Sequence, residues 1–235
     1  MKMIKTCLLC FLILGCGRLF AQETRQKLID NAAIEYLQAA GSQAVLYYGN
    51  LQEGLPRTSN HPYLKDDQYA KSRLSYHRII YPEALLRLDL YRNELVIQSP
   101  ELRNFVLSHE DVEYAELHGQ RIIYFHRDSL PGCPSTGYYT LLHSGKYKVL
   151  ERQTAQLVQD SRSTVLDQYY TFTTIFYLNK DDVYYTIRNK RGLLKVLHPY
   201  KKELKRFISA HHWRFRHDAE VLIAQTVNEY EKITE

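Results

Sequence analysis

The sequence predicts an α+β fold: an antiparallel, hairpin-rich β-sheet of about ten strands, with an N-terminal helix and two or three C-terminal helices packed on it. Two patterns support this class. From about Leu74 to Arg188, apolar and polar side chains alternate with the period of two that is typical of strands. On both sides of this region, apolar residues recur at helical spacing instead.

The first 21 residues are predicted to be a secretory signal peptide. Lys2 and Lys5 precede a short apolar run over residues 7–14, and Ala21 offers a small residue for cleavage. The alternative is a lipoprotein that is cleaved before Cys16. We therefore expect an exported protein that is periplasmic, outer-membrane-associated or secreted, with residues 22–235 forming a single α+β domain.

Cleavage after Ala21 changes the composition of the mature chain. It removes three of the four cysteines, so that Cys133 is the one that remains and no internal disulfide is expected. It also removes Lys2, Lys5 and Arg18, which lowers the net charge from +5 to about +2. A charge this small gives no reason to expect nucleic-acid binding. No later segment has the ~20 consecutive apolar residues of a membrane-spanning helix, so none is expected in the mature chain.

Residues 23–40 are predicted to form the N-terminal helix, with Gly41 at its end. Its apolar stripe consists of Ile29, Ala32, Ala33, Tyr36 and Ala40. The strand region, residues 44–188, follows. It begins with a loop-rich stretch over residues 50–67 that is punctuated by glycine and proline.

Alternation defines the faces of the predicted strands. Leu86, Leu88 and Leu90 share one face, and the other face carries Arg87, Asp89 and Tyr91. In the same way, one face of a later strand carries Tyr170, Phe172, Thr174, Phe176 and Leu178. Short turns are predicted at Arg92-Asn93, His118-Gly119, Ser144-Gly145 and Lys180-Asp181. Turns this short join antiparallel neighbours.

The C-terminal helices are predicted over residues 190–233, and Pro199 begins the second of them. One arc of this second helix is apolar, formed by Leu197, Tyr200, Leu204, Phe207 and Ile208. The opposite arc is basic, formed by Lys201, Lys202, Lys205 and Arg206. We expect this basic arc either to be a plain solvated face or to bind an anionic surface or an acidic partner.

Twenty tyrosines, several of them in doublets, suggest a second binding surface. Neighbours on a strand point to opposite faces, so each doublet places one ring inward and one outward. Outward rings at Tyr139, Tyr170 and Tyr185 would form a platform for a sugar or a peptide. The alternative is that these rings pack in cross-strand pairs.

The sequence shows no recognisable catalytic, cofactor-binding or metal-binding motif. Three clustered histidines, His211, His212 and His217, are crowded by Arg214 and Arg216, so no metal site is expected. No cofactor is expected either. The enzymatic alternative is a secreted hydrolase whose residues only the fold would assemble. Its candidates are His61, Asp66, Asp67, His126 and Cys133.

Four segments together resemble a group of uncharacterised exported proteins from Bacteroidota. They are His61-Pro62-Tyr63 and the ranges 74–97, 137–155 and 169–208, and they are marked by tyrosine-rich hairpins and a basic, leucine-rich helix. The resemblance implies an envelope or secreted setting, and it implies no activity, cofactor or site residue. We therefore expect a non-catalytic envelope protein that binds a partner protein, a glycan or a peptide.

Overall fold

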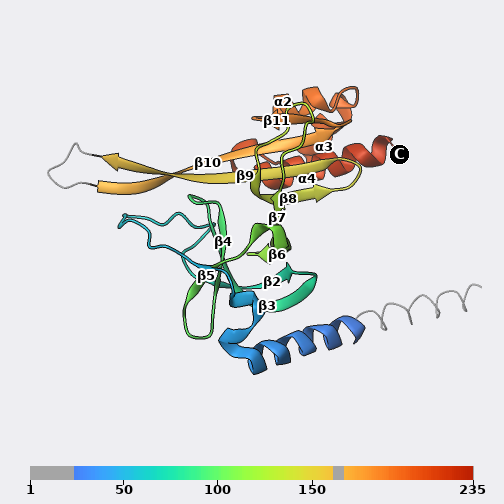
Figure 1. Ribbon diagram of the computed structural model, residues 1–235. Coiled ribbons are helices and arrows are strands. Elements are labelled where there is room, and N and C mark those ends of the chain that lie inside the picture. The colour runs from blue at the N-terminus through green and yellow to red at the C-terminus, as the bar shows by residue number, and fades with distance from the viewer. Residues whose placement is uncertain (1–23, 161–166, 235) are drawn as a thin grey trace, which may run out of the picture.

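The computed structural model describes residues 24–160 and 167–234 (Figure 1). In these ranges, 11 strands form one antiparallel sheet, accompanied by an N-terminal helix over residues 24–40 and three C-terminal helices. The predicted α+β class is confirmed. The predicted signal peptide, residues 1–21 with Cys16, lies outside the described residues.

The helices and strands follow the predicted order along the chain. The strands are β1 (Asn50–Leu51), β2 (Ala70–Tyr76), β3 (Ile79–Asp89), β4 (Glu94–Gln98), β5 (Asn104–Val106), β6 (Val112–Leu117), β7 (Gln120–Phe125), β8 (Gly137–Ser144), β9 (Lys148–Asp160), β10 (Asp167–Lys180) and β11 (Val183–Ile187). The C-terminal helices are α2 (Lys190–Val196), α3 (Lys201–Ala210) and α4 (Phe215–Thr234). Short 3-10 helices cover Gly41–Gln43, Val45–Tyr47 and His109–Asp111.

The strands lie in the order β1-β5-β4-β3-β2-β6-β7-β8-β9-β10-β11. The predicted hairpins are present, with left-handed backbone at Asn93, His118 and Asp181 in three of the turns. A further hairpin joins β2 to β3 through His77 and Arg78, which both have positive φ angles. The sequence did not indicate this turn, because neither residue type favours a left-handed backbone strongly.

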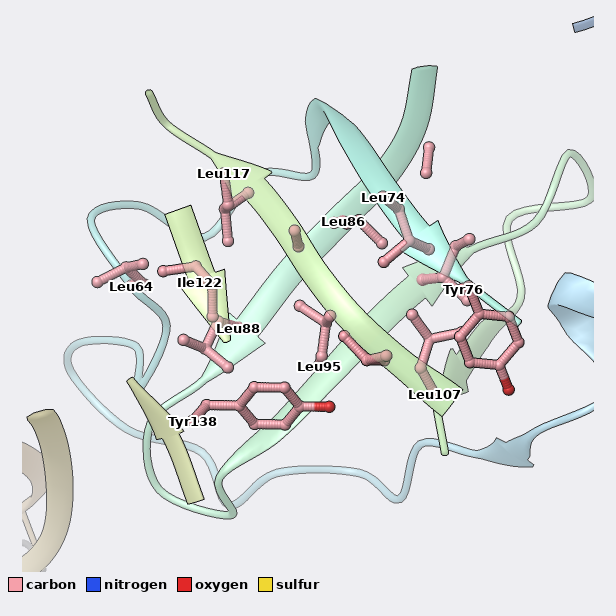
Figure 2. Close-up of a cluster of buried hydrophobic side chains, with 14 of the residues drawn as sticks. Leu64, Leu74, Tyr76, Leu86, Leu88, Leu95, Leu107, Leu117, Ile122 and Tyr138 are labelled. Atoms are coloured by element: carbon pink, nitrogen blue, oxygen red, sulfur yellow. The ribbon is translucent and has the colours of Figure 1, made fainter. Parts of the chain in front are cut away.

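The N-terminal half of the sheet curls around a first core. β5 and β6 are four strand spacings apart in the sheet order, about 19 Å if the sheet were flat. Only five residues, 107–111, connect them, and three of these form a 3-10 helix. Curling brings the two strands close enough for this short connection. Figure 2 shows buried side chains of the first core meeting inside the curl, among them Leu74, Leu86, Leu95, Leu117 and Ile122.

A second core lies between the C-terminal half of the sheet and helices α2–α4, at the opposite end of the molecule from the N-terminal helix (Figure 1). It contains Val149 of β9, Leu178 of β10 and Leu222 of α4. A smaller cluster occupies the other face of the same strands. There the loop over residues 126–136 covers Tyr139, Leu150 and Tyr184.

Both faces of β3 are covered near its C-terminal end. Leu86, Leu88 and Leu90 are all buried, as predicted. Asp89, on the opposite face, is fully buried as well, and its Oδ1 accepts hydrogen bonds from the backbone N–H groups of Tyr91 and Arg92 at 2.9 and 3.0 Å. This carboxylate holds the β3–β4 turn, which alternation along the strand cannot reveal.

The N-terminal helix is buried less completely than its apolar stripe predicted. Ala33 is buried and Leu37 packs against the first core, but Ile29 and Tyr36 are 45% and 41% exposed. An ion pair between Asp30 and Arg73 of β2, at 2.8 Å, holds the middle of the helix to the sheet. The helix therefore docks mainly through its C-terminal half.

The face predicted for β10 is also interrupted. Tyr170 lies in the first core, and Phe176 and Leu178 lie in the second. Phe172 and Thr174, between them, are exposed. The long β9–β10 hairpin thus spans both cores and leaves a short uncovered stretch where one ends and the other begins.

Candidate functional site

Two of the three tyrosines predicted to face solvent are buried, so the predicted tyrosine platform is wrong at these positions. Tyr139 is 1% exposed. Its ring packs edge-on against Phe125 and Tyr177, with centroids 5.5 and 6.2 Å away. Its hydroxyl donates a hydrogen bond to the carbonyl of Ser135 at 2.6 Å. The loop over residues 126–136 therefore covers the face on which this ring was expected to be free.

Tyr170 is 2% exposed and packs against Tyr91 at 5.3 Å between ring centroids. The Asn60 side chain bonds both the N–H and the carbonyl of Tyr170, at 2.7 and 2.8 Å, and ties the loop before β2 onto β10. Tyr185 is different, because it is 38% exposed on the edge strand β11, which contacts α2. A binding role for Tyr185 stays a prediction.

The basic arc of α3 faces solvent as predicted. Lys201, Lys202, Lys205 and Arg206 are all exposed. Leu204 and Ile208, on the opposite side of the helix, are fully buried in the second core. The burial of these apolar residues orients α3 and presents the four cations together on one side.

The basic surface of α3 continues into a hollow beside α2. The hollow has a volume of about 520 Å³ and includes Lys201, the first residue of α3. The side chains around it are basic, polar or apolar, and no carboxylate from residues 24–160 or 167–234 lines it. The lining consists of Asn189, Arg191, Gly192, Leu194, Lys195, His198 and Lys201. We call the exposed basic residues of this region, Arg191, Lys195, His198, Lys201, Lys202, Lys205 and Arg206, the basic face.

The positive charge of this region is not neutralised within the described part of the chain. Eight Lys and Arg residues lie between Arg188 and Phe207, and Glu203 is the one acid among them. None of the eight forms an ion pair with a described residue. Like charges that lie close together raise the local positive potential and attract anions. The arrangement can therefore bind phosphate, sulfate or carboxylate groups through charge-assisted hydrogen bonds.

The five residues considered for a hydrolase each make contacts with near neighbours in the sequence. His61 accepts a hydrogen bond from the backbone N–H of Tyr63 at 3.3 Å, and its ring stacks on that tyrosine. His126 packs against Tyr124, with ring centroids 5.0 Å apart. Asp66 and Asp67 each accept a hydrogen bond from Gln68. Among the described residues, no hydrogen bond or ion pair joins either histidine or Cys133 to another candidate.

Cys133 also lacks the environment of a nucleophile. Its Sγ accepts a hydrogen bond from the backbone N–H of Asp128 at 3.4 Å, and it packs beside Tyr184 and Leu130. Burial raises the pKa of the Cys133 thiol. Catalytic thiols require the opposite shift, because the thiolate is the reactive form.

Sequence reasoning missed a second site, which lies around Glu151 of β9. This residue is 2% exposed and lines a groove of about 540 Å³ between α4 and the sheet. The signal was present in the alternation, because Glu151 is two residues from Val149 and so shares its inward face. A carboxylate at an inward position is rare and often functional.

Within residues 24–160 and 167–234, no group of three or more histidine, cysteine or acidic side chains could hold a metal ion. The ring of His211 stacks on Trp213 at 4.4 Å between centroids, and Asp218 accepts a hydrogen bond from the backbone N–H of Arg214 at 2.8 Å. None of the helices in this part of the chain is both long enough and apolar enough to span a membrane.

Comparison of the chain with known protein families, curated proteins and solved structures finds no match. The resemblance to exported Bacteroidota proteins therefore stays a prediction.

Proposed function

We propose that this chain is an exported, non-catalytic protein of the cell envelope that binds an anionic glycan through its basic face. The observation that carries the proposal is the hollow of about 520 Å³ that Arg191, Lys195, His198 and Lys201 line, with no carboxylate of the described chain beside them. Export rests on the signal-like N-terminus of the sequence. We favour binding over hydrolysis, because among the described residues no hydrogen bond or ion pair joins His61, His126 or Cys133 to another hydrolase candidate.

The shape of the basic face favours a polymer with discrete anionic groups over a flat lipid surface. A helix that inserts into a membrane interface presents its apolar side to the lipid. The apolar side of α3 instead packs in the second core, where Leu204 and Ile208 are fully buried. A concave site lined by separate cations suits the sulfate, phosphate or carboxylate groups of a chain that runs across it.

The exposed basic residues of α3 extend the site beyond the hollow. One anionic group would occupy the hollow beside Lys195, and its neighbours along the polymer would meet Lys202, Lys205 and Arg206. Exposed single ion pairs contribute little, about 0–1 kcal/mol each. Binding should therefore depend on several contacts along the polymer and should weaken as salt screens them.

Heparin, a sulfated glycan, is a suitable probe. The double variant Lys195→Gln/Lys201→Gln should bind heparin about tenfold more weakly than the wild type, because the loss of two exposed ion pairs costs up to about 2 kcal/mol. The matched control, Lys71→Gln/Lys232→Gln, removes the same charge from two lysines that pair with Glu83 and Glu229 elsewhere on the surface.

Calorimetric titration at several salt concentrations measures the heparin affinity of each variant and its dependence on salt. The proposal requires the control variant to bind within about twofold of the wild type, because a net-charge effect alone would weaken both variants equally. Equal weakening of the two variants, or no heparin binding by the wild type at low salt, would contradict it. Stronger binding to anionic lipid vesicles than to heparin would favour a membrane surface instead.

A further inference from the structure

A groove between the first turns of α4 and the sheet forms a second site that shares no residue with the basic face. Its larger part, about 540 Å³, lies between Phe215–Val221 of α4 and strands β9 and β10. A hollow of about 360 Å³ continues it toward β7 and β8. Glu220 and Val221 line both parts, so both adjoin the same turn of the helix.

Glu151 forms part of the groove wall. It lies on β9 with Thr140 of β8 and Phe176 of β10 as its cross-strand neighbours, and Thr140 is itself buried. Its Oε1 accepts a hydrogen bond from Gln153 Nε2 at 3.0 Å. Its Oε2 is buried and has no hydrogen-bond partner among the described residues. A buried carboxyl oxygen without a partner costs free energy that a suitable ligand would recover.

A second carboxylate shares this groove. Glu220 of α4 accepts a hydrogen bond from Gln120 Nε2 at 2.9 Å. Burial, and after it the negative charge of Glu220, raise the pKa of Glu151 to about 7, while the hydrogen bond from Gln153 and the positive charge of Lys65 lower it. The other charged or titratable groups that line the groove are Arg216, His217 and Asp218 of α4 and Arg121 of β7.

The lining indicates which chemistry would fit. Two carboxyl groups attract a cation, and an ammonium group can donate hydrogen bonds to both. Gln153 and Thr174 offer an amide and a hydroxyl for neutral polar groups. Phe176 and Phe215, with ring centroids 6.1 Å apart, provide an apolar wall of the kind on which sugar rings pack.

From this geometry we infer that the groove binds an amino sugar whose free ammonium group lies between Glu151 and Glu220. The hydroxyl groups of the sugar would bond to Gln153 and Thr174, and its ring would pack against Phe215. A neutral sugar would leave Glu151 Oε2 without a charged partner and would bind more weakly.

Glucosamine and glucose form a matched pair of probes, because they differ only in an amine that replaces one hydroxyl. Titration followed by two-dimensional NMR of the full mature chain should show glucosamine shifting resonances of residues 215–225. Glucose should bind at least about tenfold more weakly, because it lacks the charge-assisted contact. Glucosamine affinity should also rise about tenfold between pH 5.5 and 7, as the fraction of ionised Glu151 increases.

The variant Glu151→Gln removes the carboxylate charge but keeps the shape of the side chain, because glutamine is nearly isosteric with protonated glutamic acid. It should bind glucosamine about tenfold more weakly at pH 7 and should lose most of the pH dependence. The matched control is Glu229→Gln, which removes the same charge from α4, the helix that carries Glu220. Glu229 lies nine residues beyond Glu220, about 13 Å along the helix axis, and pairs with Lys232.

The control variant should bind glucosamine like the wild type. Equal binding of glucose and glucosamine, unchanged affinity in Glu151→Gln, or no glucosamine binding at tens of millimolar would each overturn the inference. Heparin binding provides the check on folding, since a folded Glu151→Gln chain should retain its basic face. A loss of both activities in this variant alone would assign Glu151 to folding and not to the ligand.

Discussion

At the scale of single residues, Glu151 makes stability depend on pH. Burial raises its pKa from 4.5 to about 7 in the folded chain. Between these values the unfolded chain releases the proton while the folded chain keeps it, so stability falls as the pH rises through this window. Above pH 7 the ionised Glu151 lowers the unfolding free energy by its full amount, about 3 kcal/mol.

The variant Glu151→Gln removes this ionisation. We expect it to be more stable than the wild type at pH 8, by up to about 3 kcal/mol, and close to it at pH 4.5. Urea unfolding at both pH values measures the difference, and comparison with the wild type cancels the other buried carboxyls, such as Asp89. A stability difference that is the same at both pH values would show that Glu151 does not titrate in this way.

Gly132 is a residue whose replacement should be costly for two reasons. Its φ angle is +70°, and an added Cβ would lie 2.2 Å from the carbonyl oxygen of Tyr184. Gly119 provides the control, because its φ angle is +74° and an added Cβ would meet nothing within 4 Å. Left-handed backbone alone costs about 1–2 kcal/mol for an alanine.

We therefore expect Gly119→Ala to lose about 1 kcal/mol of unfolding free energy and Gly132→Ala clearly more, because the steric clash adds to the strain. In Gly132→Ala the loop over residues 126–136 should also detach from β11. The clash lies next to the hydrogen bond that the backbone N–H of Tyr184 donates to the carbonyl of Pro131 at 2.9 Å. Chemical denaturation gives the free energies, and the rate of thiol labelling at Cys133 reports on the loop. Equal losses in the two variants would show that the loop shifts without cost.

At the scale of elements, α3 separates the contribution of packing from that of charge. Leu204 is fully buried in the second core, whereas Lys202 is exposed on the opposite side of the helix. Leu204→Ala should cost about 2–5 kcal/mol of unfolding free energy, and Lys202→Ala less than about 0.5 kcal/mol. Thermal or urea unfolding checks both values. A large loss in Lys202→Ala would show that the basic face also supports the fold.

The same helix shows what the sequence could predict. Apolar spacing identified Leu204 and Ile208 as the buried side of α3 and the four cations as its exposed side, although Leu197 of the predicted arc ends α2 instead. Turn residues such as Asn93 and Gly119 identified hairpins, because they favour left-handed backbone. These signals are local, and each depends on a few neighbouring residues.

The errors occurred where distant segments decide which face is covered. Alternation places Tyr139 and its neighbour on opposite faces, but it cannot show that the loop over residues 126–136 covers one face and the curl of the sheet the other. Alternation places Arg87 on the face opposite the leucines, but it cannot show that its guanidinium stacks on Tyr63 and Tyr69 of the loop before β2, at 3.6 and 4.3 Å. Glu151 was overlooked for the related reason that its groove needs α4, which lies about 70 residues away in the chain.

At the scale of the whole molecule, one sheet joins two cores that share little else. The first core packs around Leu86, and the second packs around Leu222. β9 and β10 pair along 13 residues and contribute side chains to both, Ala155 and Tyr170 to the first and Val149 and Leu178 to the second. Unfolding one core would therefore break backbone hydrogen bonds between β9 and β10, and the other core depends on the same pair of strands.

This continuity predicts a single cooperative unfolding transition. Trp213 is the only tryptophan of the chain and packs against the second core, so its fluorescence reports on that core alone.

Leu86→Ala creates a cavity in the first core and should cost about 2–5 kcal/mol of unfolding free energy. If the sheet couples the cores, this variant should lower the midpoint seen by Trp213 fluorescence as much as the midpoint seen by far-UV circular dichroism. Leu222→Ala, in the second core, should likewise shift both signals together. A circular dichroism midpoint that falls in Leu86→Ala while the Trp213 midpoint stays unchanged would instead mean that the exposed stretch at Phe172 and Thr174 separates two independently folding halves.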